Sequence, residues 1–522
     1  RLPLMRYSRK NTALQCDTEK EKDMKSKYII ALDQSTTSTK VFLIDREGKV
    51  ISSLAKRHKQ MYPKPGWVDH DPDEIYRNSV ELIHRTLRES SVTEDRIAAI
   101  ALTNQRETTV VWNRKTGKPV CNASVWQCMR SKEICERIIK EGGDREIKDK
   151  TGYMPVPSTP GGKLTWVLEH VKGAREMADA GELLYGTTAT WLLWKLTDGK
   201  VHATDHSNAS RSLLYNINKL EWDKGLMDIF GVPRSMFPTV KYSDEIFGYT
   251  SAAAGFSKEI PITGIMGDSF AAMFGHVCYG KGSAKATYGT GSSIVMNIGA
   301  SPLESKDGLV TSIAWGMNGS ITYVMEGNVN FSGAVMQWLC EDLGLLPDLD
   351  GVEETALGLE DNGGMYFVPA FNGLGAPYWD NDAKAAIVGI SREANKANVV
   401  RAALESIAYQ NRDILDLMVR QAGVDLPELR VDGGGTKNRF LMQFQADILG
   451  VPLMVAGDED TSAVGSAYMA GIAVGIWKSL EDIEKLRSAK GEFRPRMARG
   501  DADRYYAGWK DAVGRVLTKA AD

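Results

Sequence analysis

The sequence predicts an α/β protein with two related domains that face each other across a cleft. Residues 28–45 read as two apolar, β-rich runs around a tight turn of hydroxyl residues, and the same organisation returns at residues 284–296. This repeat period is far too long for a solenoid and indicates related domains instead. Between the two hairpins, the apolar residues 262–267 lead to Asp268 at a glycine-flanked corner, and small residues follow at helical spacing.

Asp268 is the candidate general base. A carboxylate that projects from a strand-to-helix turn into a cleft is well placed to accept a proton from a substrate. The competing interpretation of the local sequence is that Asp268 caps the N-terminus of the helix. The pair of matching hairpins on either side favours the catalytic interpretation.

The amino-acid composition indicates which kinds of binding partner the protein has. The chain has 522 residues, of which 25% are charged and 43% hydrophobic, and its formal net charge is −3. These values are ordinary for a soluble globular protein and give no electrostatic reason to expect nucleic acid or a membrane as a partner. No apolar run approaches the length of a membrane span. The six cysteines show no metal-binding spacing, so we expect free thiols and a cytoplasmic location.

The first 27 residues differ from the rest of the chain. Basic residues come first and acidic residues follow, with almost nothing to bury. We therefore expect residues 1–27 to form a disordered extension.

The tip of the first hairpin is a candidate anion-binding turn. Hydroxyl residues after Asp33 offer side-chain and backbone donors. The alternative is a plain Ser/Thr turn at a sheet edge. Downstream, Asp71, Pro72 and Glu74 supply an N-cap, a first-turn proline and a first-turn acid, which predict a helix.

Two further turns carry polar residues of interest. The buried strand predicted at residues 97–102 ends near Arg106 and Glu107, whose side chains can converge if the strand breaks there. The alternative is a solvated strand end. Later, three glycines follow Asp432 after a short strand, and they allow the backbone to approach a flat ligand or a phosphate.

These motifs together resemble the FGGY carbohydrate kinases, and among them most closely the glycerol kinases. The matching segments occur in the family order at residues 33–40, 104–108, 267–268, 288–291 and 432–434. Two longer family signatures are found at residues 158–170 and 385–405. The resemblance extends from Tyr28 to about Leu517.

The resemblance implies two domains of the actin and hexokinase type, with ribonuclease H-like cores that flank an ATP-binding cleft. The N-terminal domain would span residues 28–277 and carry the polyol site and the first phosphate loop. The C-terminal domain would span residues 278–522 and bind ATP. The implied activity is ATP-dependent phosphorylation of a terminal hydroxyl of a small polyol, by a homo-oligomer of two or four copies. The alternative from another class is a catalytically silent binding protein with the same fold.

The resemblance also assigns roles to residues. Asp268 would be the catalytic base, and Asp33 with Asp268 would hold Mg²⁺. The residues implied to bind ATP are Asp33, Gln34, Ser35, Thr36, Thr37, Lys40, Gly289, Thr290, Gly291, Gly333, Gln337, Gly433, Gly434 and Asn438.

The substrate end of the site both follows and departs from the family pattern. Arg106, Glu107 and Trp126 stand where glycerol kinases hold glycerol, and Asp268 completes that set. Three positions depart, because the family residues Tyr, Gln and an aromatic residue are here Ser158, Ser269 and Ser293, respectively. A roomier, more hydroxylated pocket would favour a longer polyol or a ketose, such as a tetritol, a pentitol or xylulose. The alternative is that neighbouring side chains fill the space and glycerol stays the substrate.

Overall fold

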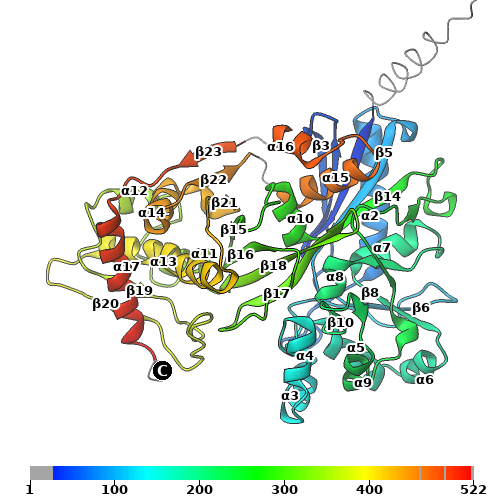
Figure 1. The fold of residues 1–522 in the computed structure, drawn as a ribbon, viewed down its shortest axis with the longest axis horizontal. Coiled ribbons are helices and arrows are strands. Elements are labelled where there is room, and N and C mark those ends of the chain that lie inside the picture. The colour runs from blue at the N-terminus through cyan, green and yellow to red at the C-terminus, as the bar shows by residue number, and fades with distance from the viewer. Residues whose placement is uncertain (1–26, 458–459, 487–488, 519–522) are drawn as a thin grey trace, which may run out of the picture.

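The computed structural model describes residues 27–457, 460–486 and 489–518. The predicted disordered extension, residues 1–27, therefore lies outside the described residues except for Lys27. Two bodies, each built around a β-sheet, lie side by side (Figure 1). Among the described helices, none is both long enough and apolar enough to cross a membrane.

The first sheet has six strands in the order β13-β14-β5-β1-β2-β3. Strands β1 and β5 and strands β5 and β14 pair in parallel, whereas β1, β2 and β3 form an antiparallel meander. The first predicted hairpin is thus confirmed as β1 and β2. The strand bounds are β1 Tyr28–Gln34, β2 Ser38–Ile44, β3 Val50–Arg57, β5 Ile97–Asn104, β13 Gly248–Tyr249 and β14 Pro261–Gly267.

Helices cover both faces of this sheet. Apolar residues of α2 (Pro72–Glu89) and α7 (Thr188–Leu196) pack on one face, and those of α10 (Asp268–Gly275) and α15 (Thr461–Ala473) pack on the other. Helix α2 begins as predicted, since the Asp71 side chain accepts the backbone N–H of Asp73 and Pro72 is the first helical residue. An insertion between β5 and β13 contains β6 Val110–Asn113, α3 Lys132–Lys140, α4 Asp144–Thr151, α5 Pro160–His170, α6 Ala174–Asp179, β8 Leu183–Gly186, α8 His206–Ser210 and α9 Lys224–Phe230.

The second sheet has seven strands in the order β17-β18-β16-β15-β21-β22-β23. Strands β15 and β16 form the second predicted hairpin, and β15, β21 and β22 are parallel neighbours. The bounds are β15 Ala284–Tyr288, β16 Ser292–Gly299, β17 Val310–Met317, β18 Ser320–Val329, β21 Leu429–Asp432, β22 Leu453–Ala456 and β23 Ala489–Phe493. The helices associated with this body are α11 Gly333–Glu341, α12 Val352–Leu357, α13 Lys396–Ala422, α14 Arg439–Leu449 and α17 Arg499–Gly514.

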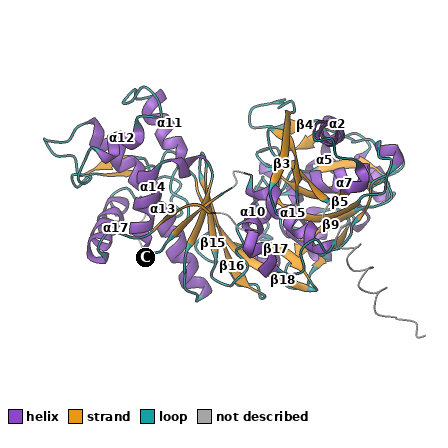
Figure 2. Cartoon of the chain, turned by 90° about the horizontal axis from the view of Figure 1, so that it is seen from above, coloured by secondary structure: helices purple, strands orange, loops and turns teal. Residues whose placement is uncertain are grey.

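One apolar cluster joins the two bodies. Helix α15 follows β22 of the second sheet in the chain, yet it packs against α10 and against β1, β5 and β14 of the first sheet. Val295 and Val324 of the second sheet belong to the same cluster. Helix α10, which begins at Asp268, lies between the two sheets (Figure 2). The position of Asp268 therefore depends on how the two bodies pack.

Helices α10 and α15 cross where each of them has a glycine, Gly275 on α10 and Gly465 on α15. A Cβ atom on Gly465 would lie 1.8 Å from the carbonyl oxygen of Ala271 and 2.7 Å from the backbone nitrogen of Gly275. On the other helix, a Cβ atom on Gly275 would lie 2.4 Å from the carbonyl oxygen of Thr461. Only glycine permits this close backbone approach.

We predict that Gly465→Ala lowers the free energy of unfolding by ~1–3 kcal/mol, because the added methyl forces α10 and α15 apart. Urea denaturation measures the change. The matched control is Gly514→Ala at the end of α17, where a Cβ atom would meet no neighbour within 4 Å. Equal stability losses in both variants would contradict the role assigned to the helix crossing.

Candidate active site

Asp268 is the first residue of α10, directly after strand β14. The N-cap of the helix is Gly267, so the interpretation of Asp268 as the cap residue is wrong. The Asp268 carboxylate accepts the backbone N–H of Ser269 at 2.7 Å, and its side chain keeps 40% of its surface exposed. Partial removal from water raises its pKa, whereas the positive charge of Arg106 opposes the increase.

Arg106 joins Asp268 to the second sheet. Its Nε lies 3.3 Å from Oδ1 of Asp268, and its Nη1 donates to Oε2 of Glu326 at 2.6 Å. Glu326 is on β18, so this contact crosses from one body to the other. The predicted strand break is real: β5 ends at Asn104, and Glu107 follows with a φ of 64°.

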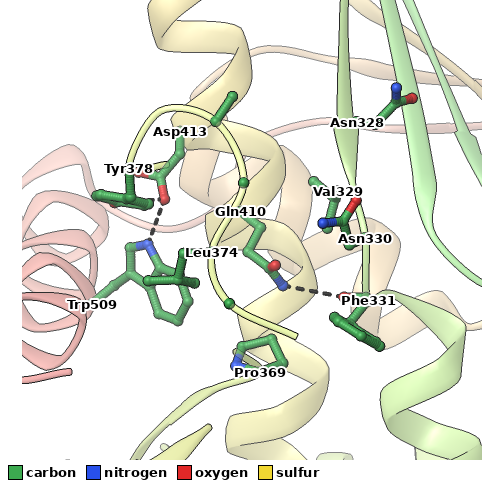
Figure 3. A pocket seen from close by; sticks show the side chains of 13 residues that line it. Asn328, Val329, Asn330, Phe331, Pro369, Leu374, Tyr378, Gln410, Asp413 and Trp509 are labelled. Carbon is green, nitrogen blue, oxygen red and sulfur yellow. Dashed lines mark hydrogen bonds between the residues drawn. The ribbon is translucent and has the colours of Figure 1, made fainter. Parts of the chain in front are cut away.

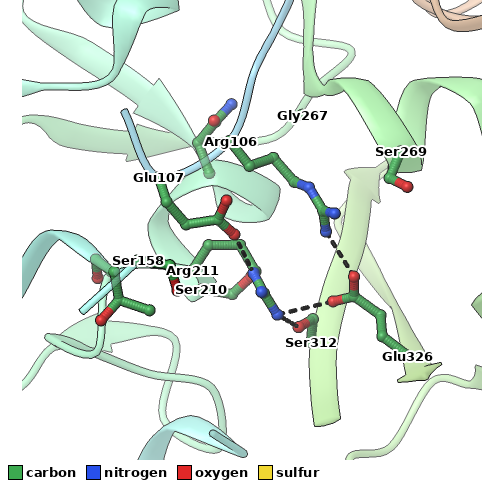
Figure 4. A network of polar contacts seen from close by, with 12 residues as sticks. Arg106, Glu107, Ser158, Ser210, Arg211, Gly267, Ser269, Ser312 and Glu326 are labelled. Carbon is green, nitrogen blue, oxygen red and sulfur yellow. Dashed lines mark hydrogen bonds and ion pairs between the residues drawn. The ribbon is translucent and has the colours of Figure 1, made fainter. Parts of the chain in front are cut away.

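A second arginine completes the network (Figure 4). Nε of Arg211 donates to Oε1 of Glu107 at 2.6 Å, and its Nη1 donates to Oε1 of Glu326 at 2.9 Å and to Oγ of Ser312 at 2.9 Å. Arg106 and Glu107 therefore converge on one site through Glu326 and Arg211, and the interpretation as a solvated strand end is wrong.

The network has a defined charge state. Burial alone would raise the pKa of Glu326, but the positive charges of Arg106 and Arg211 hold it at about 2. The carboxylates in turn raise the pKa of Arg106 although burial opposes this. Two guanidinium groups thus face the carboxylates of Glu107, Glu326 and Asp268. Such fixed donors and acceptors are suited to neutral hydroxyl groups.

Asp33 is the penultimate residue of β1, just before the tip of the first hairpin. Oγ of Ser35 donates to its Oδ2 at 3.1 Å, but its buried Oδ1 has no hydrogen-bond partner among the described residues. Burial, and next the negative charge of Asp268, raise the pKa of Asp33 to about 7. A buried carboxylate oxygen without a partner, next to a second carboxylate, fits a hydrated cation. No group of three or more His, Cys, Asp or Glu in the described part of the chain forms a complete metal site by itself.

Two neighbouring side chains bind Thr36 at the tip of the first hairpin. Nε2 of Gln60 donates a hydrogen bond to the carbonyl oxygen of Thr36 at 3.0 Å, and Nε1 of Trp126 donates one to the Thr36 hydroxyl at 3.0 Å. Trp126 is a candidate substrate residue, and its contact with Thr36 joins it to the first hairpin while 39% of its surface stays exposed.

The remaining candidates of this hairpin differ in exposure. Gln34 is buried, and its amide accepts Nε2 of Gln105 at 3.0 Å. Thr37 is exposed. Lys40 pairs with Asp460 at 2.6 Å, in front of α15.

The second hairpin borders a pocket of about 480 Å³. Backbone N–H of Gly333, at the start of α11, donates to the carbonyl oxygen of Gly289 at 2.9 Å, and Gly291 closes the hairpin tip by accepting the N–H of Gly289. The pocket walls include six of the candidate nucleotide residues, namely Gly289, Thr290, Gly333, Gln337, Gly434 and Asn438. This depression has the size and the mixed lining expected for a nucleoside.

Gly433 and Lys40 line an adjoining pocket of about 730 Å³, which shares Gly434 with the first. Gly433 has a φ of 91°, and a Cβ atom there would lie 2.4 Å from the carbonyl oxygen of Tyr288. Glycine is therefore required for the third turn to reach the second hairpin. The two pockets extend from the first hairpin to α11.

The three serine positions have different surroundings. Ser158 and Ser269 lie on opposite sides of Arg106 and Glu107 (Figure 4). Oγ of Ser269 lies 3.3 Å from Nζ of Lys285, so a neighbouring cation occupies part of the space there. Ser293 is half-buried on β16, at the side of the second hairpin.

Four residues of the site were not predicted: Arg211, Ser312, Glu326 and Lys285. Lys285 is 1% exposed, and its Nζ donates to Oγ1 of Thr287 at 2.8 Å. The sequence does carry a signal for Glu326 and Lys285, because each is a lone charge within an apolar strand. Arg211 follows a run of small polar residues and Ser312 is an uncharged residue of β17, so only the fold brings them to the site.

Comparisons with known proteins agree with this geometry. The chain matches the models of the N-terminal and C-terminal domains of the FGGY family of carbohydrate kinases over residues 28–275 and 284–474. It is 49% identical to a glycerol kinase of Caldanaerobacter subterraneus subsp. tengcongensis, over 95% of this chain and 100% of that protein. It is 47% identical to glycerol kinase 2 of Thermotoga maritima, over 94% of this chain and 99% of that protein.

A solved structure gives the same result. Plasmodium falciparum glycerol kinase with ADP is 35% identical, with a TM-score of 0.91, and the match covers 95% of this chain and 99% of that chain. The structure of a xylulose kinase of Lactobacillus acidophilus has a TM-score of 0.83 at 21% identity, and the match covers 94% of this chain and 99% of that chain. At this identity the match shows only that the two folds are similar. The predicted two-domain fold and the family resemblance are thereby confirmed.

We predict that Glu326→Ala lowers the free energy of unfolding by ~3–5 kcal/mol, because it leaves Arg106 and Arg211 without their shared buried carboxylate. Chemical denaturation measures this loss. The control is Glu89→Ala, which removes the exposed pair between Glu89 and Arg85 and should change stability little. Similar small effects in both variants would show that the network does not stabilise the domain contact.

Proposed function

This chain belongs to the FGGY family of carbohydrate kinases, and we propose that it phosphorylates a terminal hydroxyl of glycerol with ATP. One observation carries the proposal. The Asp268 carboxylate lies beside Arg106 and close enough to Asp33 of the first hairpin for their charges to interact, at the head of the helix between the two bodies. This arrangement brings together a base, hydroxyl-binding groups and a phosphate loop.

Asp268 acts as the general base in this proposal. The substrate oxygen attacks the γ-phosphorus of ATP, its proton passes to the Asp268 carboxylate, and ADP leaves with the bridging oxygen. Phosphoryl transfer needs mainly an in-line position and neutralised charge. The fixed contact between Asp268 and the backbone N–H of Ser269 orients the base for this step.

We propose the following roles for the residues that bind the substrate. The Arg106 guanidinium donates to, and the Glu107 carboxylate accepts from, the hydroxyls that do not react. The Trp126 indole covers the carbon chain while its N–H holds Thr36 of the phosphate loop. Ser158, Ser269 and Ser293 complete the wall of the site. Because Arg106 and Glu107 are already held by Glu326 and Arg211, the donor and acceptor need little rearrangement when substrate binds.

ATP is proposed to lie across the two adjoining pockets. Its adenosine would occupy the pocket between Gly333 and Asn438, and its phosphates would extend past Thr290 toward Thr36 and Lys40. Backbone N–H groups and hydroxyls of the two hairpins supply phosphate donors. The relative of known structure that carries ADP supports use of this nucleotide.

We propose that Asp33 and Asp268 hold Mg²⁺ together with the ATP phosphates. The partnerless oxygen of Asp33 and the repulsion that the Asp268 charge exerts on the Asp33 carboxylate support this assignment. When bound, Mg²⁺ would neutralise the phosphate charge.

The proposal also covers domain roles and assembly. Residues 28–277 would bind the polyol and residues 278–522 would bind ATP, and closure of the two would exclude water. We further propose a cytoplasmic homo-oligomer of two or four copies, whose mass analytical ultracentrifugation would measure. The free thiols of Cys121, Cys128, Cys135 and Cys340 support the proposed location.

We predict that Asp268→Asn lowers kcat for glycerol by about a hundredfold to ten-thousandfold, because the amide cannot accept the proton. Coupled ADP release measures kcat, and calorimetry checks that ADP binding is kept. The control is Asp228→Asn, at an exposed pair with Lys224 on α9. Wild-type turnover in Asp268→Asn would refute the assigned base. Absence of ADP release from the wild-type chain with any polyol would instead favour a silent binding protein.

We predict that Gly333→Ala raises KM for ATP by about tenfold, the equivalent of ~1.4 kcal/mol. An added Cβ atom would lie 2.7 Å from the carbonyl oxygen of Gly289 and would displace the second hairpin from α11. Steady-state kinetics at saturating glycerol measures the effect. The control is Gly351→Ala, which has open space around its Cβ position. An unchanged KM for ATP would show that this contact does not shape the nucleotide site.

A further inference from the structure

The sheet register places Ser293 beside Asn328. In the antiparallel pair of β16 and β18, Ser293 lies opposite Asn328 and Val295 lies opposite Glu326. Side chains two residues apart on a strand point to the same face, so Glu326 and Asn328 share a face with Val295 and Ser293. Val295 and Val324 pack in the cluster with α10 and α15, which identifies this face as the one turned toward the first body.

Glu326 fixes where this face meets the substrate site. It contacts Arg106, whose Nε lies 3.3 Å from Asp268. Asn328 lies two residues farther along β18, or roughly 7 Å by strand geometry, on the side of the second hairpin tip. The pair of Ser293 and Asn328 is thus between the ion-pair network and the proposed phosphate loop.

Both side chains have free hydrogen-bonding capacity. Neither the Asn328 amide nor the Ser293 hydroxyl bonds to any residue that the structure describes, and Asn328 is exposed. The other residues on this face of β18 already have protein partners. Glu326 is paired with two arginines, and Val324 packs in the apolar cluster. Figure 3 shows the Asn328 side chain on the other side of its strand from Val329 and Gln410. Asn328 lines the small cavity drawn there, but its side chain takes no part in the hydrogen bonds drawn around that cavity.

The chemistry of the pair indicates a neutral polar ligand. An amide and a hydroxyl each donate and accept, which matches a substrate hydroxyl. An anionic group is disfavoured, because the nearby guanidinium groups of Arg106 and Arg211 are already paired with carboxylates. Among the three serine positions, Ser293 differs from Ser269, whose hydroxyl is approached by Lys285.

We propose that Ser293 and Asn328 form a second hydroxyl-binding subsite, so that the enzyme phosphorylates polyols of four or five carbons in addition to glycerol. The proposal rests on the proposed kinase function and names the residues that extend its substrate range. A polyol that lacks the additional hydroxyl would leave both groups without a protein or substrate partner. A longer polyol would satisfy them and gain affinity.

The test compares kcat/KM for erythritol, D-threitol, xylitol and D-arabitol with kcat/KM for glycerol, by coupled ADP release. We expect at least one of the longer polyols to reach about a tenth or more of the glycerol value. Asn328→Ala should lower the ratio of that polyol to glycerol by about tenfold, since one hydroxyl partner is lost. Ser293→Phe, which fills the subsite, should lower the same ratio at least as much.

The matched control is Asn330→Ala, two residues farther on and also exposed, in the lining of the cavity in Figure 3. It should leave the ratio within about threefold of wild type. The proposal is overturned if glycerol is used but every longer polyol falls below that tenth. It is also overturned if Asn328→Ala lowers the ratio less than predicted, or if Asn330→Ala lowers it equally.

A binding readout separates this proposal from the proposed function. If no compound supports ADP release, the kinase function fails, and isothermal titration calorimetry with xylitol and erythritol then tests the subsite alone. Saturable binding that weakens about tenfold in Asn328→Ala supports the subsite, and absence of such binding overturns it.

Discussion

The site depends on one buried ion-pair network that crosses between the two bodies. Arg106 and Arg211 come from the first body, and Glu326 comes from a strand of the second. Buried charges are tolerated only when partners compensate them, so neither body can satisfy this set by itself. The contact therefore fixes the relation of the two sheets and, at the same time, the orientation of the two residues proposed to hold the substrate. The atoms that stabilise the contact between the bodies are thus also those proposed to bind the substrate.

The helix that carries Asp268 is subject to a second constraint. Helix α10 crosses α15 with backbone atoms close together, since Gly275 and Gly465 leave no room for a side chain. Helix α15 comes from late in the chain but packs on the first sheet. The direction of the Asp268 carboxylate is thus determined by a contact between distant segments. A rearrangement of the two bodies would move the proposed base, the ion pairs and the proposed nucleotide loops together.

The side of the site proposed to bind the nucleotide is built mainly from backbone. Two hairpin tips and a glycine turn approach one another, and Gly433 reaches the second hairpin through a backbone conformation that favours glycine. Backbone donors suit a ligand whose charge is spread over phosphate oxygens. The side proposed to bind the polyol is built from side chains instead, and there the three serines and Asn328 are proposed to alter the substrate range without changing the proposed nucleotide site.

The sequence by itself determined the local elements and the family. Alternation of apolar residues predicted both hairpins, capping residues predicted α2, and ordered motifs identified an FGGY kinase, because these signals depend on neighbours in the chain. Local sequence left the cap interpretation of Asp268 open, and the backbone around Gly267 decided it. Arg211, Ser312 and the facing pair of Ser293 and Asn328 were decided only by the tertiary structure. Strand register and domain packing bring these residues to the site, and such long-range pairing leaves no pattern among adjacent residues.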